Sequence, residues 1–169
     1  KSLSIKKLDK LLISHGDNDH SGGSEAVLAG IRVKHLLTNE EISHDKPASY
    51  KVSSCNEGRQ WVWEGVSFKI QHPQKVTTAS GNNTSCVLQV KSRFGSLLLP
   101  ADIETEAEDE ILSRYGNELN SSILVAPHHG SKSSSSKAFL DAVSPELVLI
   151  PAGWMNRYRH PSKAVIARF

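Results

Sequence analysis

The chain has 169 residues, of which 38% are hydrophobic and 22% are charged, proportions that fit one globular domain spanning residues 1–169. Its net charge of +2 at pH 7 neither requires nor excludes a nucleic-acid partner, because a local basic patch matters more than the total. No apolar run reaches the roughly 18–20 residues that a membrane-spanning helix needs, and no signal peptide is recognisable. Because the sequence starts at Lys1 without a Met, we expect it to be cut from a longer protein.

The first part of the chain alternates short apolar runs with polar segments. Residues 11–13 predict a buried strand, and a polar loop follows from His15 to Gly23. A short helix is predicted from Glu25 to Leu28 and a strand from Val33 to Leu37. The stretch 38–58 is polar and predicted to be irregular.

Two β-hairpins are predicted in the middle of the chain. The first pairs residues 61–63 with 66–70, where apolar and polar side chains alternate cleanly after the turn. The second pairs residues 85–90 with 96–99. His72, in a His-Pro pair at a strand end, is interpreted as structural.

The remaining elements are helices and short strands. A helix is predicted from Thr105 to Tyr115, with a capping box of Thr105 and Glu108 at its start. After it we expect a strand at 122–126, a helix at 134–143, a strand at 147–150 and a final helix at 162–169. Hairpins mixed with strand–loop–helix units predict a mixed α/β (α+β) domain in which helices cover sheets.

A segment dense in possible metal ligands follows the first predicted strand. Its four candidates, within six positions, are His15, Asp17, Asp19 and His20. A loop after a buried strand can turn such side chains inward, and the following glycine pair permits a tight turn. The alternative is a solvated polar loop.

Two further polar clusters also follow apolar strands. The segment Pro127–Ser131 holds two adjacent histidines, one suited to a metal ion and the other to contacting substrate or orienting its neighbour. The alternative is a pair of surface histidines. Asp102 directly follows the apolar run 97–101. A carboxylate at such a position can bridge two cations. Taken alone, the position favours a helix N-cap.

The order of these clusters and their placement after strands resemble the metallo-β-lactamase superfamily. Over nearly the whole chain, the sequence resembles more specifically the C-terminal domain of the ComEC family of DNA-uptake competence proteins. The matching segments are residues 14–23, 61–63, 82–88, 102–104, 127–131 and 156–161.

This resemblance implies an αββα sandwich, without that fold's leading hairpins in this sequence. It also implies a parent protein in the bacterial inner membrane, whose channel carries single-stranded DNA and which exposes this domain on the periplasmic side. From the residues alone, Cys55 and Cys86 are either two reduced thiols or one disulfide. The extracytoplasmic location that the resemblance implies favours the disulfide.

The resemblance also implies a metal centre of one or two divalent ions. The superfamily's pattern assigns His15, Asp17 and Asp102 to one ion, and Asp19, His20, Asp102 and His129 to the other. The sequence departs from the pattern in two respects, because Asp17 replaces the usual second histidine and the separate mid-chain histidine is missing. The first site is therefore rich in oxygen ligands, which makes Mn²⁺ or Mg²⁺ as plausible as Zn²⁺.

The function implied is a metal-dependent phosphodiesterase or deoxyribonuclease that degrades the non-transported DNA strand. Its DNA partner is expected to be single-stranded, and no nucleotide cofactor is expected. The alternatives are a non-catalytic module that guides DNA and a phosphodiesterase of small molecules. The residues expected to carry catalysis are Asp19, His128 and His160, and those expected to contact substrate are Asn83, Ser131, Lys132 and Arg157, with Arg159 as a further cation that can attract DNA.

Overall fold

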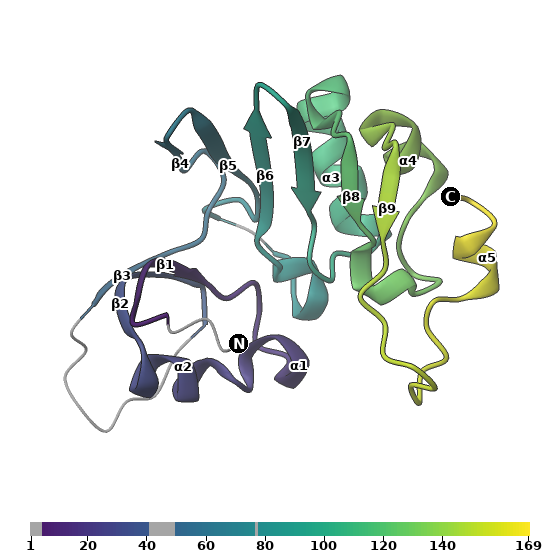
Figure 1. The fold of residues 1–169 in the computed structure, drawn as a ribbon. Helices are drawn as coiled ribbons and strands as arrows, with labels where there is room; N and C mark the ends of the chain where they lie inside the picture. Colours follow the sequence, from purple (N-terminus) through teal and green to yellow (C-terminus); the bar gives the residue numbers. More distant parts are fainter. Residues whose placement is uncertain (1–4, 41–49, 77) are drawn as a thin grey trace. The chain divides into compact units, whose positions relative to one another are not determined.

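The computed structural model describes residues 5–40, 50–76 and 78–169 of the chain (Figure 1). It comprises two compact units, residues 1–55 and 56–169, and each unit contains one sheet. The mixed α/β class predicted from the sequence is therefore confirmed. Among the described residues, no helix is both long and apolar enough to cross a bilayer.

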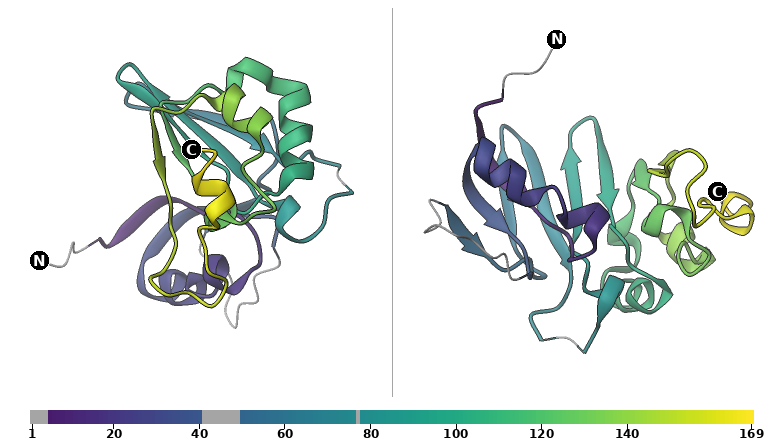
Figure 2. Two further views of the ribbon diagram at one scale, coloured as in Figure 1. Left: turned by 90° about the vertical axis from the view of Figure 1, so that its right-hand side faces the viewer. Right: turned by 90° about the horizontal axis from the view of Figure 1, so that it is seen from below.

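The N-terminal unit is built on a three-stranded parallel sheet. Its strands, in the order β1-β2-β3, are β1 (Lys7–Leu12), β2 (Arg32–Leu37) and β3 (Lys51–Ser53). The helices α1 (Asn18–Ser21) and α2 (Ser24–Gly30) connect β1 to β2 and lie along one side of the sheet (Figure 2). Strand β3 was not predicted, because it lies in the polar stretch 38–58, of which residues 41–49 are outside the described part.

The second unit is built on a six-stranded sheet in the order β4-β5-β6-β7-β8-β9. Strands β4 to β7 are antiparallel neighbours, whereas β8 and β9 run parallel to β7. The strands are β4 (Gln60–Trp63), β5 (Val66–His72), β6 (Val87–Ser92), β7 (Gly95–Leu99), β8 (Ile123–Val125) and β9 (Leu147–Leu149). The helical segments are η1 (Gly81–Thr84), α3 (Thr105–Tyr115), η2 (Gly116–Leu119), η3 (Pro127–Gly130), α4 (Lys137–Val143) and α5 (Lys163–Ile166).

The core of the second unit lies between this sheet and the helices α3 and α4. Leu98 of β7 and Leu124 of β8 are register partners, so their side chains share the face on which the helices pack. Ile111 of α3 and Phe139 of α4 meet them there, and all four side chains are fully buried. Each such side chain stabilises the fold by roughly 1.5–3 kcal/mol relative to an exposed one. The core fixes β7 and β8, whose ends carry the polar clusters.

The helix α3 begins where the sequence predicts, but the predicted capping box is wrong. Its N-cap residue is Glu104, and no side chain caps the helix. The fully buried Glu108 carboxylate instead accepts hydrogen bonds from the backbone N–H groups of Ser135 (2.5 Å) and Ser136 (2.8 Å). These bonds tie α3 to the start of α4, which begins at Lys137 rather than at residue 134. Burial raises the pKa of Glu108, against the lowering effect of the N–H donors.

We expect Glu108→Gln to lower the free energy of unfolding by about 1–3 kcal/mol, because the amide nitrogen cannot accept from a backbone N–H and leaves one buried donor unsatisfied. Urea denaturation measures the effect. Asp109→Asn, an exposed neighbour on the same helix, is the matched control and should unfold like the wild type. Equal stability of both variants would show that the Glu108 bonds contribute nothing.

Candidate functional site

The ligand-rich loop of the N-terminal unit follows β1 directly and leads into α1. Asp17 is the N-cap residue of α1, yet its side chain makes no capping hydrogen bond. The loop is closed by its backbone and by Ser21, whose hydroxyl donates to the Gly16 carbonyl oxygen at 2.8 Å. A Cβ on Gly16 would lie 2.7 Å from an oxygen of Glu40, so only glycine fits here without moving that side chain. Because Asp17 makes no capping hydrogen bond, its carboxylate does not contribute to closing the loop.

Two histidines of this loop share one hydroxyl group. Ser14 Oγ lies 3.1 Å from His15 Nδ1 and 3.3 Å from His20 Nδ1, and the two rings are 4.3 Å apart. The other ring nitrogens lie beside carboxylates. His15 Nε2 is 3.8 Å from Asp17 Oδ2, and His20 Nε2 is 3.9 Å from Asp19 Oδ2. These separations are longer than a hydrogen bond. They suit two atoms that ligate the same cation, because each metal–ligand bond is about 2.0–2.2 Å long.

Asp102 lies immediately beyond β7 in the second unit, and its side chain is buried. Its backbone N–H donates to Ser85 Oγ at 3.4 Å. The N-cap interpretation of Asp102 does not hold, because the helix that follows takes Glu104 as its N-cap. The position is instead a buried carboxylate at the end of a core strand, where rigid elements present catalytic groups.

The two histidines after β8 form a strained turn, η3. His128 and His129 both have left-handed backbone conformations, with φ values of 48° and 55°. Such conformations cost a non-glycine residue roughly 1–3 kcal/mol and persist only where the surroundings impose them. The His128 N–H donates to the Ala101 carbonyl oxygen at 3.0 Å, which joins this turn to the residue before Asp102.

The hydrogen bond of His129 orients its ring as in a metal ligand. Its Nδ1 lies 2.8 Å from the Pro151 carbonyl oxygen, and a carbonyl can only accept, so Nδ1 carries the proton. The lone pair is therefore on Nε2, which lies 3.4 Å from Asp102 Oδ2. A backbone carbonyl behind the ring is the usual support of a ligating histidine. Asp102 and His129 thus fit a divalent cation by donor type and orientation.

His128 faces a different set of groups. Its Nδ1 lies 3.3 Å from a carboxylate oxygen of Glu104, and its Nε2 is 3.4 Å from the amide nitrogen of Asn82. The ring of His160 is 5.8 Å away. Burial lowers the pKa of His160, and the nearby His128 and His129 lower it further. Nε2 of His128 also lies 3.9 Å from Asp102 Oδ2, so His128 adjoins the proposed metal ligands, and its contacts with Glu104 and His160 suit proton transfer.

The structure distributes the predicted substrate-contacting residues unevenly. The amide of Asn83 is engaged internally, since it accepts from the Glu104 N–H at 2.8 Å and donates to Glu106 at 3.3 Å. Ser131 is buried and its hydroxyl is 3.0 Å from that of Ser133. Lys132 and Arg157 are exposed.

Three polar neighbours of the histidines were missed by the sequence reasoning. They are Ser14, Asn82 and Glu104. All three lie in the segments that carry the family resemblance, but no spacing rule distinguishes Asn82 from Asn83. Cys55 and Cys86 are both buried, and neither is a free thiol.

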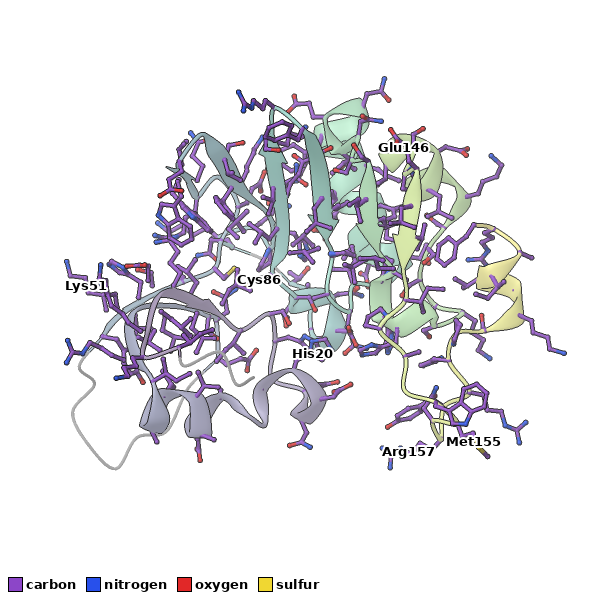
Figure 3. The ribbon with its side chains drawn as sticks, in the orientation of Figure 1. His20, Lys51, Cys86, Glu146, Met155 and Arg157 are labelled. Atoms are coloured by element: carbon purple, nitrogen blue, oxygen red, sulfur yellow. The ribbon has the colours of Figure 1, made fainter. Side chains whose placement is uncertain are left out.

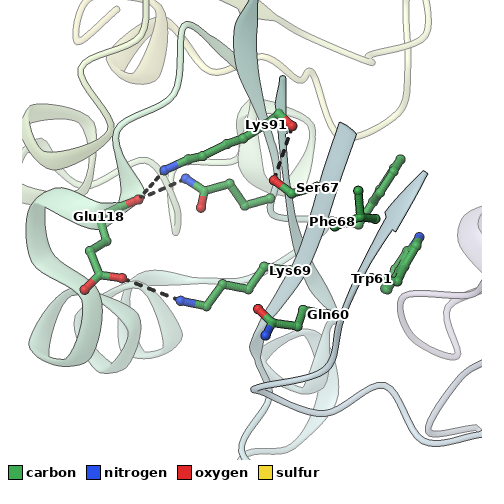
Figure 4. A pocket seen from close by; sticks show the side chains of 9 residues that line it. Gln60, Trp61, Ser67, Phe68, Lys69, Lys91 and Glu118 are labelled. Carbon is green, nitrogen blue, oxygen red and sulfur yellow. Dashed lines mark hydrogen bonds and ion pairs between the residues drawn. The ribbon is translucent and has the colours of Figure 1, made fainter. Parts of the chain in front are cut away.

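A separate pocket of 390 Å³ lies over β4, β5 and β6 and contains none of the predicted site residues (Figure 4). Its two lysines are already engaged with Glu118. Lys69 Nζ lies 3.5 Å from the Glu118 carboxylate, and Lys91 Nζ donates to the Glu118 carbonyl oxygen at 3.1 Å. Their charge is thus partly compensated within the protein.

His72 supports the loop that precedes β6, as its structural interpretation predicts. Its buried ring donates from Nδ1 to the Ser85 carbonyl oxygen at 3.0 Å, and Nε2 lies 3.7 Å from Glu110 Oε2. Burial lowers the pKa of His72, although the Ser85 carbonyl and Glu110 act in the opposite direction. Because Ser85 in turn holds the backbone of Asp102, His72 positions that residue indirectly.

Comparison with known proteins places this geometry in context. The family model described as metallo-beta-lactamase superfamily matches residues 1–154. The chain is 38% identical to "Competence protein ComA" of Neisseria gonorrhoeae, over 95% of this chain and 22% of that protein. It is 35% identical to "Recombination protein 2" of Haemophilus influenzae, over 95% of this chain and 20% of that protein. The chain thus spans about a fifth of the length of these relatives.

A solved structure with the same fold is the metallo-beta-lactamase fold protein YhfI from Bacillus subtilis. The TM-score is 0.53 at 10% sequence identity, and the match covers 94% of this chain and 71% of that one. At this identity the likeness bears on the fold alone.

We expect the stability of the protein to fall with pH below about 6.5, the pKa of an unperturbed histidine. The folded-state pKa of His72 is lowered, so the unfolded state takes up the proton first and is stabilised relative to the folded state as pH falls. His72→Asn keeps an N–H donor near the Ser85 carbonyl oxygen, but an asparagine side chain does not titrate in this pH range. Urea denaturation from about pH 7 to about pH 5.5 should show a steeper loss in the wild type. Identical pH dependence would contradict this role.

Proposed function

Because the chain belongs to the metallo-beta-lactamase superfamily, we propose that it is a metal-dependent phosphodiesterase domain that cleaves DNA during DNA uptake. The observation that carries the proposal is the pairing of Asp102 with the Nε2 lone pair of His129 at 3.4 Å. A buried carboxylate and an imidazole oriented by a carbonyl form a donor set for a divalent cation.

The proposed ligands follow the superfamily's pattern. His15, Asp17 and Asp102 serve one ion, and Asp19, His20, Asp102 and His129 serve a second. Bound divalent ions supply Lewis acidity for a phosphodiester and lower the pKa of bound water. The mixture of carboxylate and imidazole donors suits Mn²⁺ and Zn²⁺, with Mg²⁺ as a further candidate.

The protein's own proton-transfer group in this proposal is His128. Its Nδ1 lies 3.3 Å from a Glu104 oxygen, and Nε2 is the proposed atom that exchanges a proton with the leaving oxygen. Asn82, now beside Nε2, is displaced or contacts the phosphate when substrate binds. His160, beside His128, is the second proposed acid, and the alternative role proposed for Asp19 is to orient the attacking water. Ser131, Lys132 and Arg157 are proposed to contact the DNA backbone.

The DNA substrate is suggested by the similarity to "Competence protein ComA". We propose single-stranded DNA and degradation of the strand that is not transported. The parent protein is proposed to form the channel in the inner membrane, with this domain on the periplasmic side. A disulfide between Cys55 and Cys86 accords with that oxidising location and with the lack of a free thiol.

A second candidate function is a DNA-guiding module without catalysis. It is favoured by Asp17, which stands where the superfamily usually has a histidine. The presence of Asp19, His20, Asp102 and His129 argues against it, because a decayed site should have lost more of these ligands.

We expect the purified chain to degrade labelled single-stranded DNA when Mn²⁺ is added and to stop when a chelator removes the metal. Asp102→Asn should lower the rate by more than about 100-fold, since the loss of a bridging ligand exceeds the effect of a supporting residue. Gel analysis of the labelled strand measures the rate.

Asp109→Asn, which removes an exposed carboxylate far from the histidines in sequence, serves as the control and should retain the rate. Wild-type rates in Asp102→Asn would refute the proposed site. A folded, metal-loaded chain without any cleavage would refute the nuclease and favour the guiding module.

A further inference from the structure

We propose that residues 151–161, here called the 151–161 loop, form a stacking platform that receives the unpaired bases of single-stranded DNA. Tyr158 takes the base nearest the histidines, Trp154 takes a second base, and Arg157 and Arg159 meet the phosphates between them. The inference rests on the proposed function, because it names the surface by which that site recognises a single strand.

The loop exposes three large aromatic and apolar side chains. Trp154 is 94% exposed, Met155 87% and Tyr158 63%. Figure 3 shows Met155 and Arg157 at the outer end of this loop, directed away from the sheet. Large side chains exposed together over a few residues indicate a contact surface. Aromatic rings are the groups on which unpaired bases stack.

The loop is held in one conformation by its own hydrogen bonds. The Asn156 amide donates to the carbonyl oxygens of Gly153 (2.9 Å) and His160 (2.7 Å), and its oxygen accepts from the His160 N–H (2.9 Å). The Arg159 N–H also donates to the Asn156 carbonyl oxygen at 3.0 Å. A surface that is already ordered loses little conformational entropy when it binds.

A series of aromatic rings connects the loop to the histidines of the candidate site. Tyr158 stacks on His160 with ring centroids 5.7 Å apart and 16° between the planes. His160 in turn meets the edge of His128 at 5.8 Å. A base stacked near Tyr158 therefore brings its own phosphate toward the group proposed to exchange protons.

The base of the loop is fixed to the η3 turn. The Ser162 N–H donates to the Gly130 carbonyl oxygen at 2.9 Å. A Cβ on Gly130 would lie only 2.6 Å from Pro161, so the close approach of the two segments requires glycine, which also adopts a φ of 80° there. The base of the platform and the η3 turn are therefore in direct contact.

The charge of this part of the chain favours a polyanion. From residue 147 to residue 169 the sequence has four arginines and lysines and no acidic residue. One of them, Arg168, is engaged with the carbonyl oxygens of Ser134 and Ser135. Arg157 lies over the Tyr158 ring at 4.5 Å and donates to the Tyr158 hydroxyl, so its guanidinium leaves the ring when it meets a phosphate and a base stacks there. Cations interleaved with aromatic rings match the alternation of phosphate and base along a single strand.

The platform distinguishes single strands from duplexes. In a duplex each base already stacks on its neighbours and pairs with its partner, so its face is not available to a side chain. The basic residues alone would attract both forms. We therefore assign the preference for single strands to Trp154 and Tyr158.

Fluorescence anisotropy of labelled oligonucleotides with the 169-residue chain, in the presence of a chelator, tests the proposal separately from hydrolysis. We expect tighter binding of a single strand than of the matching duplex. Trp154→Ala should weaken binding of the single strand roughly 5- to 150-fold and should change binding of the duplex little. Trp154→Phe, which keeps an aromatic face, should restore most of the loss.

Phe94→Ala is the matched control. Phe94 is 84% exposed and carries Arg93 over its ring at 4.5 Å, the same pairing as Tyr158 with Arg157, but it lies in the turn between β6 and β7. This variant should bind single strands like the wild type. Because Trp154 and Phe94 are both exposed, neither substitution should alter the melting temperature, which is measured first.

The outcomes separate the platform from the nuclease. Metal-dependent hydrolysis of methyl 4-nitrophenyl phosphate should be unchanged in Trp154→Ala, because this substrate is not a nucleic-acid strand. Loss of single-strand binding in Trp154→Ala supports the platform even if no hydrolysis is seen. Unchanged binding, or an equal loss in Phe94→Ala, overturns it. So does binding of anionic phosphatidylglycerol vesicles that depends on Trp154 while DNA binding does not, since the loop would then contact a membrane.

Discussion

The buried carboxylate of Asp102 is the feature on which the rest of the candidate site depends. A carboxylate in a protein interior is costly unless cations or hydrogen-bond donors surround it. Strand β7 and the core behind it hold Asp102 in place, and the η3 turn brings His129 within 3.4 Å of its oxygen. The strain of that turn is maintained by the bond from His128 to Ala101. The fold therefore concentrates negative charge and lone pairs at one point, which is the arrangement that a divalent cation stabilises.

The sequence predicted those parts of the fold in which local rules and tertiary structure agree. Helix 105–115 and the two hairpins follow from clear periodicity and turn residues. Two ligand-rich segments follow the apolar strands β7 and β8 as expected, whereas the first follows β1, which is amphipathic and partly exposed rather than buried. The predicted capping box is wrong because the Glu108 side chain accepts hydrogen bonds from the start of α4 instead of capping its own helix. Strand β3 was missed because it is short and polar, and its pairing with β2 cannot be inferred from its composition.

The candidate site shows the same division. The proposed ligands come from the resemblance to the superfamily's pattern, because the same histidines and carboxylates taken alone also fit a polar loop, surface histidines or a helix cap. The orientations of these side chains could not be predicted from the sequence. Only the structure shows that His129 turns Nδ1 to Pro151 and that Asn82, not Asn83, meets His128. The side chains of adjacent residues point in different directions. The local backbone conformation, which is left-handed at both histidines, determines the direction of each side chain.

The most direct test of the central claim is a double-mutant cycle on Mn²⁺ affinity. Electron paramagnetic resonance of free Mn²⁺ gives the affinity of the wild type, Asp102→Asn, His129→Ala and the double variant. If both side chains ligate the same ion, each single substitution weakens binding and the double variant loses less than the sum, with a coupling of about 0.5–3 kcal/mol. Additive losses, or single variants that bind Mn²⁺ like the wild type, would contradict the claim that Asp102 and His129 form one metal centre.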